Sequence, residues 1–317
     1  MKKIKNRNKV ILSLISIIVV LILLAIGVKE ETIKDIFNIN NVEEQNVIAL
    51  DTQNELYETQ TKKNFIAEDK LVVDYIDVGQ ADSILLRNKD KTMLIDAGTN
   101  EQGKNVVSFL KEEGISKIDY LIGTHPHEDH IGGLDDVINN FDIGKIYMPK
   151  RETTTKTFKD VLSAIKNKNL TITQPKKGEI IDLGQAKCEF MTEPIIDDDN
   201  INLSSLTLRV EFGNNSFLFM GDAEKQNEKT ITWPKTDVLK VGHHGSDTSS
   251  SKEFLEQVNP KYSIIMVGEG NTYKLPKQPI IDRIEKQGSK IYRTDKNGNI
   301  KIITDGNNLE IKTEKEQ

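Results

Sequence analysis

The chain has 317 residues, of which 43 are Lys or Arg and 49 are Asp or Glu, and its formal net charge is −6. With 37% hydrophobic and 29% charged residues, the composition is that of an ordinary globular protein. It excludes a disordered, a collagen-like or a polytopic membrane protein. Cys188 is the only cysteine, which excludes an intramolecular disulfide and a site built from several thiolates. Five residues are histidine, and their positions decide most of what the sequence predicts.

The first nine residues hold five basic side chains and no acidic one, which leaves 38 basic against 49 acidic residues, a net charge of −11, for the rest. Residues 10–28 follow as a run of 19 residues without a charge. This length can just span a bilayer as a helix. The basic residues before it predict a cytoplasmic N-terminus and an extracellular remainder. A cleaved signal peptide is the alternative, with residues 25–27 as a weak cleavage site. We therefore expect residues 1–28 to form a basic tail and a transmembrane signal anchor.

Residues 29–69 are polar and rich in Glu, Asn, Gln and Thr, without sustained apolar periodicity. Such a composition is typical of a linker between a membrane anchor and a folded body. The pattern changes near residue 70, so we expect residues 70–317 to form one folded unit, of a size compatible with a single domain.

The first half of this unit begins with short β-rich runs at residues 71–76, 83–87 and 92–95, which predict an antiparallel meander. A helix at 104–113 and a buried strand at 118–122 follow. The second half has the same order: strands at 187–191, 205–212 and 216–220, then strand 238–241, helix 252–258, strand 262–267 and helix 280–287. This repeated order predicts an α/β (α+β) fold, with two similar halves that stack as two sheets and carry their helices outside.

A dense group of potential metal ligands follows the predicted strand 118–122. His125, His127, Asp129 and His130 lie within six residues and precede Gly132-Gly133. A loop at the end of a buried strand is a stiff platform for ligands, and glycines let the backbone turn sharply. His125 and His127 can point the same way in an extended loop, while Asp129 and His130 can turn toward a second metal position.

The other two histidines, His243 and His244, follow the predicted strand 238–241 and precede Gly245. Between the two loops, Asp222 follows the strand 216–220, where a carboxylate can bridge two cations. A single histidine of this kind would predict only a surface or capping role. Because all five histidines lie at strand ends beside glycine, the sequence predicts a metal site.

Residues 124–133 resemble the H-x-H-x-D-H signature of the metallo-β-lactamase superfamily, which implies a four-layer αββα sandwich. Five further blocks resemble, in order, the C-terminal hydrolase domain of ComEC-type competence DNA-uptake proteins: residues 75–83, 94–98, 218–224, 239–246 and 292–295. The resemblance covers essentially residues 70–317.

The resemblance implies a dinuclear centre for two divalent metal ions, Zn²⁺ or Mn²⁺. Spacing alone does not decide which of the neighbours His243 and His244 binds metal. His244 is therefore a candidate ligand instead of His243 or beside it. The implied ligands are His125 and His127 at the first metal, Asp129 and His130 at the second, Asp222 as the bridge and His243 at the second.

Many superfamily members place a further histidine on the first metal, in the segment before the bridging aspartate. No histidine lies between His130 and Asp222 here. Residues 202–206 resemble the Asn-x-x-Ser pattern that the ComEC-like branch carries instead, which makes Asn202 and Ser205 candidate metal or substrate contacts. Oxygen ligands make a site harder, so Mn²⁺ competes with Zn²⁺ there.

Other segments offer weaker candidates for substrate contact. Ser246 and the hydroxyls of residues 248–251 suit phosphate binding at a helix start, or they cap that helix. Leu275 stands where ComEC-like proteins often have a histidine, and Lys274 or Lys277 is either a substrate-binding cation there or a solvated surface lysine. Three aspartates in early turns are predicted to fix loops without binding metal: Asp77, Asp82 and Asp96.

Two cations in such a site lower the pKa of a shared water, so that a bridging hydroxide forms near neutral pH, and Asp129 can orient or deprotonate that water. The cations can also hold a phosphodiester against an acidic body. We therefore expect a membrane-anchored, extracytoplasmic, metal-dependent hydrolase, a phosphodiesterase or nuclease of the ComEC-like type with DNA as a candidate substrate. A chain with one predicted span is not itself the polytopic uptake channel.

Two alternatives stay open. The chain is a different hydrolase, namely a teichoic-acid or phosphorylcholine esterase, a lactonase or a β-lactamase. In a different class, it is a metal-binding cell-surface interaction protein whose missing third histidine has cost it catalysis.

Overall fold

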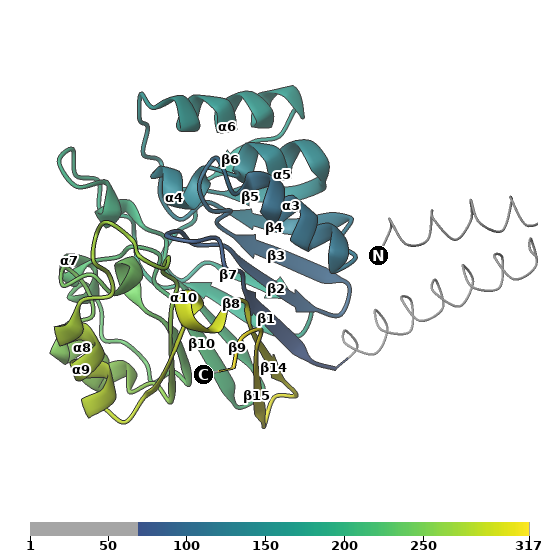
Figure 1. Cartoon of the computed structure of the whole chain (residues 1–317). Helices are drawn as coiled ribbons and strands as arrows, with labels where there is room; N and C mark the ends of the chain where they lie inside the picture. Colours follow the sequence, from purple (N-terminus) through teal and green to yellow (C-terminus); the bar gives the residue numbers. More distant parts are fainter. Residues whose placement is uncertain (1–68, 317) are drawn as a thin grey trace, which may run out of the picture. The chain divides into compact units, whose positions relative to one another are not determined.

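The computed structural model describes residues 69–316 (Figure 1). The predicted tail and anchor at 1–28 lie outside the described residues, as does all but the last residue of the predicted linker. Within the described part of the chain, no helix has the length and apolar character needed to cross a membrane.

Two mixed sheets form the centre of the fold. Sheet A consists, in spatial order, of β15 (Leu309–Thr313), β14 (Ile300–Thr304), β1 (Leu71–Tyr75), β2 (Ile84–Asn88), β3 (Lys91–Ile95), β4 (Lys117–Ile122), β5 (Asp142–Tyr147) and β6 (Ile172–Thr173). Sheet B consists of β13 (Lys290–Arg293), β12 (Tyr262–Ile265), β11 (Val238–Lys240), β10 (Asn215–Phe219), β9 (Leu208–Phe212), β8 (Ala186–Phe190) and β7 (Ile180–Leu183).

Both sheets change from antiparallel to parallel pairing in the same way. In sheet A the pairs from β15 to β3 are antiparallel and those from β3 to β6 are parallel. In sheet B the pairs from β7 to β10 are antiparallel and those from β10 to β13 are parallel. The predicted order of a β-rich run followed by alternating helix and strand is therefore confirmed in each half.

Eight α-helices lie among the described residues. They are α3 (Gly103–Glu112), α4 (Glu128–Ile131), α5 (Leu134–Asn140), α6 (Lys156–Asn167), α7 (Lys225–Glu228), α8 (Lys252–Val258), α9 (Gln278–Lys286) and α10 (Thr294–Asn297), with 3₁₀ turns at Ile201–Ser204 and Gly242–Gly245. Figure 1 shows α3, α5 and α6 over sheet A, and α8 and α9 on the side of sheet B.

Three apolar layers hold this sandwich together. The central layer lies between the sheets and includes Tyr75, Phe217 and Phe219, all less than 2% exposed. A second layer packs sheet A against α3, α5 and α6, and a third packs sheet B against α8 and α9. Burial of each such aromatic side chain contributes roughly 1.5–3 kcal/mol to the stability of the fold. The three layers therefore hold the sheets and helices against one another. The predicted two-sheet arrangement is confirmed.

Most predicted elements are present, and the main differences lie in three places. Residues 123–185, where no helix or strand was expected, contain α4, α5, β5, α6, β6 and β7. The strand expected at 205–212 begins only at Leu208, because residues 201–204 form a 3₁₀ turn and Ser205 binds the backbone of a neighbouring loop. The C-terminal hairpin β14–β15 was not expected. It adds to sheet A beside β1, where Leu71 pairs with Thr304.

Parallel strands point their carboxyl ends toward one edge of a sheet, and loops at that edge commonly form binding sites. The loop after β4 in sheet A and the loops after β10 and β11 in sheet B meet in this way. The two histidine loops and the aspartate between them are therefore brought together.

Candidate metal centre

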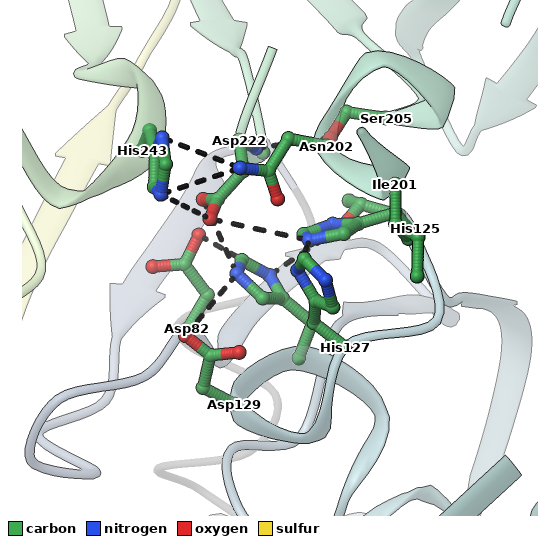
Figure 2. A network of polar contacts seen from close by, with 12 residues as sticks. Asp82, His125, His127, Asp129, Ile201, Asn202, Ser205, Asp222 and His243 are labelled. Carbon is green, nitrogen blue, oxygen red and sulfur yellow. Dashed lines mark hydrogen bonds and ion pairs between the residues drawn. The ribbon is translucent and has the colours of Figure 1, made fainter. Parts of the chain in front are cut away.

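Five histidines and two aspartates converge where these loops meet (Figure 2). Four ligand atoms, one from each of four side chains, lie within 4.8 Å of one another: they belong to Asp129, His130, Asp222 and His244. The Nε2 atom of His130 lies 3.2 Å from Oδ1 of Asp222, and Nε2 of His244 lies 3.3 Å from Oδ2 of Asp129. This cluster corresponds to the second of the two metal positions that the sequence predicts, except that His244 occupies the place for which the resemblance implied His243.

The first position lies on the other side of Asp222. Nε2 of His125 and Nδ1 of His127 are 3.0 Å apart. Nε2 of His125 is 4.0 Å from Oδ2 of Asp222, and Nε2 of His243 is 3.6 Å from the same oxygen. Asp222 thus turns one carboxylate oxygen toward each position, as a bridging ligand would.

The ligand atoms have the chemistry that a divalent metal requires. Among the described residues, the buried side-chain atoms without a hydrogen-bond partner include His130 Nε2, His244 Nε2, Asp222 Oδ1 and Asn202 Oδ1. Buried polar atoms are nearly always paired, so a group of orphaned nitrogen and oxygen atoms that face one another indicates a ligand. Imidazole nitrogen and carboxylate oxygen suit Zn²⁺ and Mn²⁺. The cluster of Asp129, His130, Asp222 and His244 therefore fits a divalent cation, and the first position offers ligand atoms of the same kinds.

Asp96 holds the first histidine loop in place. Its Oδ2 lies 2.8 Å from Nδ1 of His130 and accepts a hydrogen bond from the Thr124 hydroxyl, while its Oδ1 accepts one from the Thr124 backbone N–H. A carboxylate on Nδ1 leaves Nε2 of the same ring free for metal and fixes the ring orientation. Asp96 is fully buried and orients a ligand, in agreement with its prediction as a loop-fixing residue.

Asp82 connects the two halves through a buried lysine that sequence reasoning missed. Lys240, on β11, has no exposed surface; its Nζ pairs with Oδ2 of Asp82 and donates to the Gly221 carbonyl at 3.1 Å. Oδ1 of Asp82 lies 3.4 Å from Nδ1 of His244. A charged residue inside an otherwise apolar strand was the available signal, because buried lysines need a partner.

The second histidine loop has an unusual backbone. His243 and His244 have φ values of 48° and 50°, a left-handed conformation that is costly for residues with a Cβ atom. Gly245 follows with φ 81°, and a Cβ there would lie 2.5 Å from Cβ of Pro276. Nδ1 of His244 lies 2.8 Å from the Met266 carbonyl oxygen. These contacts turn the two neighbouring rings to different sides of Asp222.

The candidate substrate contacts occupy structural roles. Oγ of Ser205 accepts from the Asp222 backbone N–H at 3.1 Å, and Oγ of Ser251 caps α8. The buried carboxylate of Glu228 accepts from the backbone N–H groups of Ser250 and Ser251. The helix start that the sequence suggested for phosphate already binds the Glu228 carboxylate, and of the candidate hydroxyls it is that of Ser251 that caps the helix.

Two more candidates lie beside the second histidine loop. Oγ of Ser246 is 3.1 Å from Oγ1 of Thr248, which in turn lies 2.9 Å from Nδ1 of His243. Lys277 donates its backbone N–H to the Gly245 carbonyl and its ammonium to the Tyr273 carbonyl, so it closes its own loop. Ser246 thus acts on the centre through the Thr248 and His243 pair.

The electrostatics separate the two positions. Burial opposes charging of His130, yet the carboxylates of Asp222, Asp96 and Asp129 raise its pKa well above the usual value. Burial and the neighbouring His130 lower the pKa of His125 well below that value. In the second position, burial would raise the pKa of Asp129, but His130 and His244 lower it.

With this geometry, comparison with known proteins identifies the family. The profile of the metallo-beta-lactamase superfamily matches residues 76–269. The chain belongs to this superfamily. Its fold is also that of the β-hydroxylase CmlA from Streptomyces venezuelae, with a TM-score of 0.50, 15% identity and coverage of 74% of this chain and 54% of that one.

Three of the similar curated proteins are of the ComEC competence type, as the sequence blocks suggested. The chain is 31% identical to ComE operon protein 3 of Bacillus subtilis over 250 residues, which are 72% of this chain and 32% of that protein. It is 29% identical to Recombination protein 2 of Haemophilus influenzae over 75% of this chain and 29% of that protein. The metallo-β-lactamase superfamily chain thus spans about a third of these competence-related relatives.

Proposed function

We propose that the chain is a membrane-anchored, extracytoplasmic phosphodiesterase that depends on two divalent metal ions and has DNA as its candidate substrate. The observation that carries the proposal is the paired ligand set around Asp222, with one carboxylate oxygen toward each position. Two cations bound there would act as Lewis acids and lower the pKa of a water between them. The similarity to competence proteins favours nucleic acid as the phosphodiester.

The side chains suggest separate roles around the reacting group. Asp222 is only 2% exposed and belongs to the interior of the site, whereas the side chain of Asp129 is 33% exposed. Asp129 is the cluster carboxylate that can reach solvent, so it can accept or orient a proton of a water at the site. His127 is partly exposed, and its role would be to bind metal at the first position.

The test uses the full chain, stripped of metal with a chelator and then reloaded with Mn²⁺ or Zn²⁺. Single- and double-stranded DNA and bis(p-nitrophenyl) phosphate are the substrates. We expect metal-dependent turnover that falls by about 10²–10⁴-fold in Asp129→Asn, because a positioned proton acceptor contributes this much. Asp90→Asn is the matched control, since the Asp90 side chain is 84% exposed and lies outside the site.

Other substrates in the same assay separate the alternatives. Turnover of a phosphorylcholine diester without DNA cleavage would favour an esterase over the proposed nuclease. Cleavage of nitrocefin or of a lactone would favour a β-lactamase or a lactonase over a phosphodiesterase. If the metal-loaded chain turns over none of these and Asp129→Asn keeps its binding to cells, the interaction-protein alternative takes its place.

The proposed location has its own test. The uncharged run at residues 10–28 after a basic tail supports a single membrane anchor with the catalytic body outside the cell. We expect the full chain in the membrane fraction and its body accessible to protease added to intact cells. A chain that stays protected from that protease until the cells are lysed would contradict the proposed topology.

A further inference from the structure

The first metal position lacks the histidine that many superfamily members supply from the segment before the bridging aspartate. In this chain that segment is the 3₁₀ turn Ile201–Ser204, which carries Asn202. Oδ1 of Asn202 is buried and has no hydrogen-bond partner among the described residues. Figure 2 shows this amide oxygen pointing toward the space between Asp222 and His125. An orphaned oxygen aimed at histidine and carboxylate ligands indicates a ligand of its own.

The direction of this amide is fixed by Glu224. Its Oε1 accepts a hydrogen bond from Nδ2 of Asn202 at 3.2 Å, and its Oε2 accepts one from Nδ2 of Asn200 at 2.9 Å. Glu224 is itself held at the start of α7, where it exchanges two hydrogen bonds with Asn227. A carboxylate only accepts hydrogen bonds, so the amide nitrogen of Asn202 must face Glu224 and the oxygen must face away from it.

His243 faces the same position from the loop after β11. Nδ1 of its ring lies 2.9 Å from the Thr248 hydroxyl and 3.4 Å from Oε1 of Glu224. The other nitrogen, Nε2, lies 3.6 Å from Oδ2 of Asp222, the oxygen that serves the first position, and 3.4 Å from Nδ2 of Asn202. A metal bound there would replace this contact with the amide nitrogen. His244 lies with the second cluster instead. The two adjacent histidines are therefore divided between the two positions, which their left-handed backbone makes possible.

We propose that Asn202 Oδ1 and His243 Nε2 complete the first metal position, opposite His125 and His127, with Glu224 as the positioning residue for both. The inference rests on the proposed dinuclear function and assigns the sources of two ligands within it. The third nitrogen comes from the loop after β11, and an amide oxygen stands at the place of the absent histidine. This donor set adds an amide oxygen to three histidines and one carboxylate, and the added oxygen ligand makes the site harder and favours Mn²⁺.

The experiment counts bound metal and requires no substrate. The full chain is stripped of metal and titrated with Mn²⁺, while electron paramagnetic resonance reports free and bound ion. We expect two bound ions in the unaltered chain and one in Asn202→Ala and in His243→Ala. Asn202→Asp, which restores an oxygen donor, should again bind two. Glu224→Gln should weaken the first site by about 10–100-fold, the effect of losing a partner that orients a ligand.

Two controls make the count decisive. Asn214→Ala, which removes an exposed asparagine outside the site, should bind two ions. Asp129→Ala should also lose an ion, and the Asn202→Ala, Asp129→Ala double variant should then lose both. The proposal is overturned if Asn202→Ala and His243→Ala both bind two ions with unaltered affinity, or if the double variant loses no more than Asp129→Ala alone. Failure to hydrolyse a phosphodiester would leave this count unchanged.

Discussion

The loop after β4 and the loop after β11 bring histidines to one place by different means. In the first loop the backbone is ordinary: His127, for example, is extended with φ −83° and ψ 151°. In the second, His243, His244 and Gly245 all have positive φ values. The first loop offers ligands two residues apart on one side of an extended segment, whereas the second separates two adjacent ligands by reversing its backbone.

The two loops are held in their conformations by different contacts. The first depends on Asp96, at the end of the adjacent strand β3, which binds both the loop backbone and a ligand ring. The second depends on contacts from two other segments: Glu228 holds its serines, and residues 276–277 pack against Gly245. Backbone strain of this kind persists only where surrounding packing imposes it. The second loop should therefore be the more sensitive to substitutions outside the centre.

The largest expected effect comes from the buried pair of Lys240 and Asp82, which connects the two halves of the fold. Lys240→Met leaves the buried Asp82 carboxylate without its cation, and removing one partner of a buried pair costs about 3–5 kcal/mol. Urea unfolding of the metal-free chain measures the loss. Adding Asp82→Asn should recover much of it, because no uncompensated charge then remains. If the free energy of unfolding of the single variant falls by well below 1 kcal/mol, the pair does not stabilise the packing of the two halves.

A smaller effect is expected within the second loop. Gly245→Ala combines a positive φ with a clash against Pro276, which together cost about 2–4 kcal/mol. Gly114→Ala is the matched control, since Gly114 also has a positive φ but no atom within 4 Å of the added Cβ. Thermal unfolding should show a larger loss for Gly245→Ala than for the control. Equal losses would mean that the Pro276 contact does not restrain this loop.

The smallest effect concerns protons. In the metal-free chain, burial opposes charging of His130 and His244, but the neighbouring carboxylates outweigh it and raise the pKa values of both rings. Burial lowers the pKa values of His125 and His127. A cation entering the second position must therefore displace protons near neutral pH, and its affinity should fall as the pH falls.

The expected slope is about tenfold, or 1.4 kcal/mol, per pH unit for each proton displaced. His125 and His127 have lowered pKa values, so they have few protons to displace until the pH falls below the ordinary histidine range, and the first position should show a shallower slope. Mn²⁺ titrations of Asn202→Ala and Asp129→Ala between about pH 8 and pH 6 compare the two positions in the window where histidine titrates. Equal slopes would contradict the difference in proton occupancy.

The sequence by itself determined the two halves of the fold and most of the ligand set. Apolar runs bounded by turn residues predict strands because alternation and breakers are local properties of the chain. Helix 252–258 has the bounds predicted for it, because its serine cap and apolar face are local too. The gathering of five histidines and Asp222 at strand ends was visible for the same reason.

Only the tertiary structure decided what depends on distant partners. The strand β14 pairs with β1 across more than two hundred residues, and no local pattern specifies that pairing. Spacing left His243 and His244 interchangeable, whereas the fold sends them to opposite sides of Asp222. Glu224 and Lys240 gain their importance only because folding buries them beside Asn202 and Asp82. The residues that can bind metal are thus identifiable from the sequence. The orientation of their side chains depends on contacts that form only when the two sheets pack together.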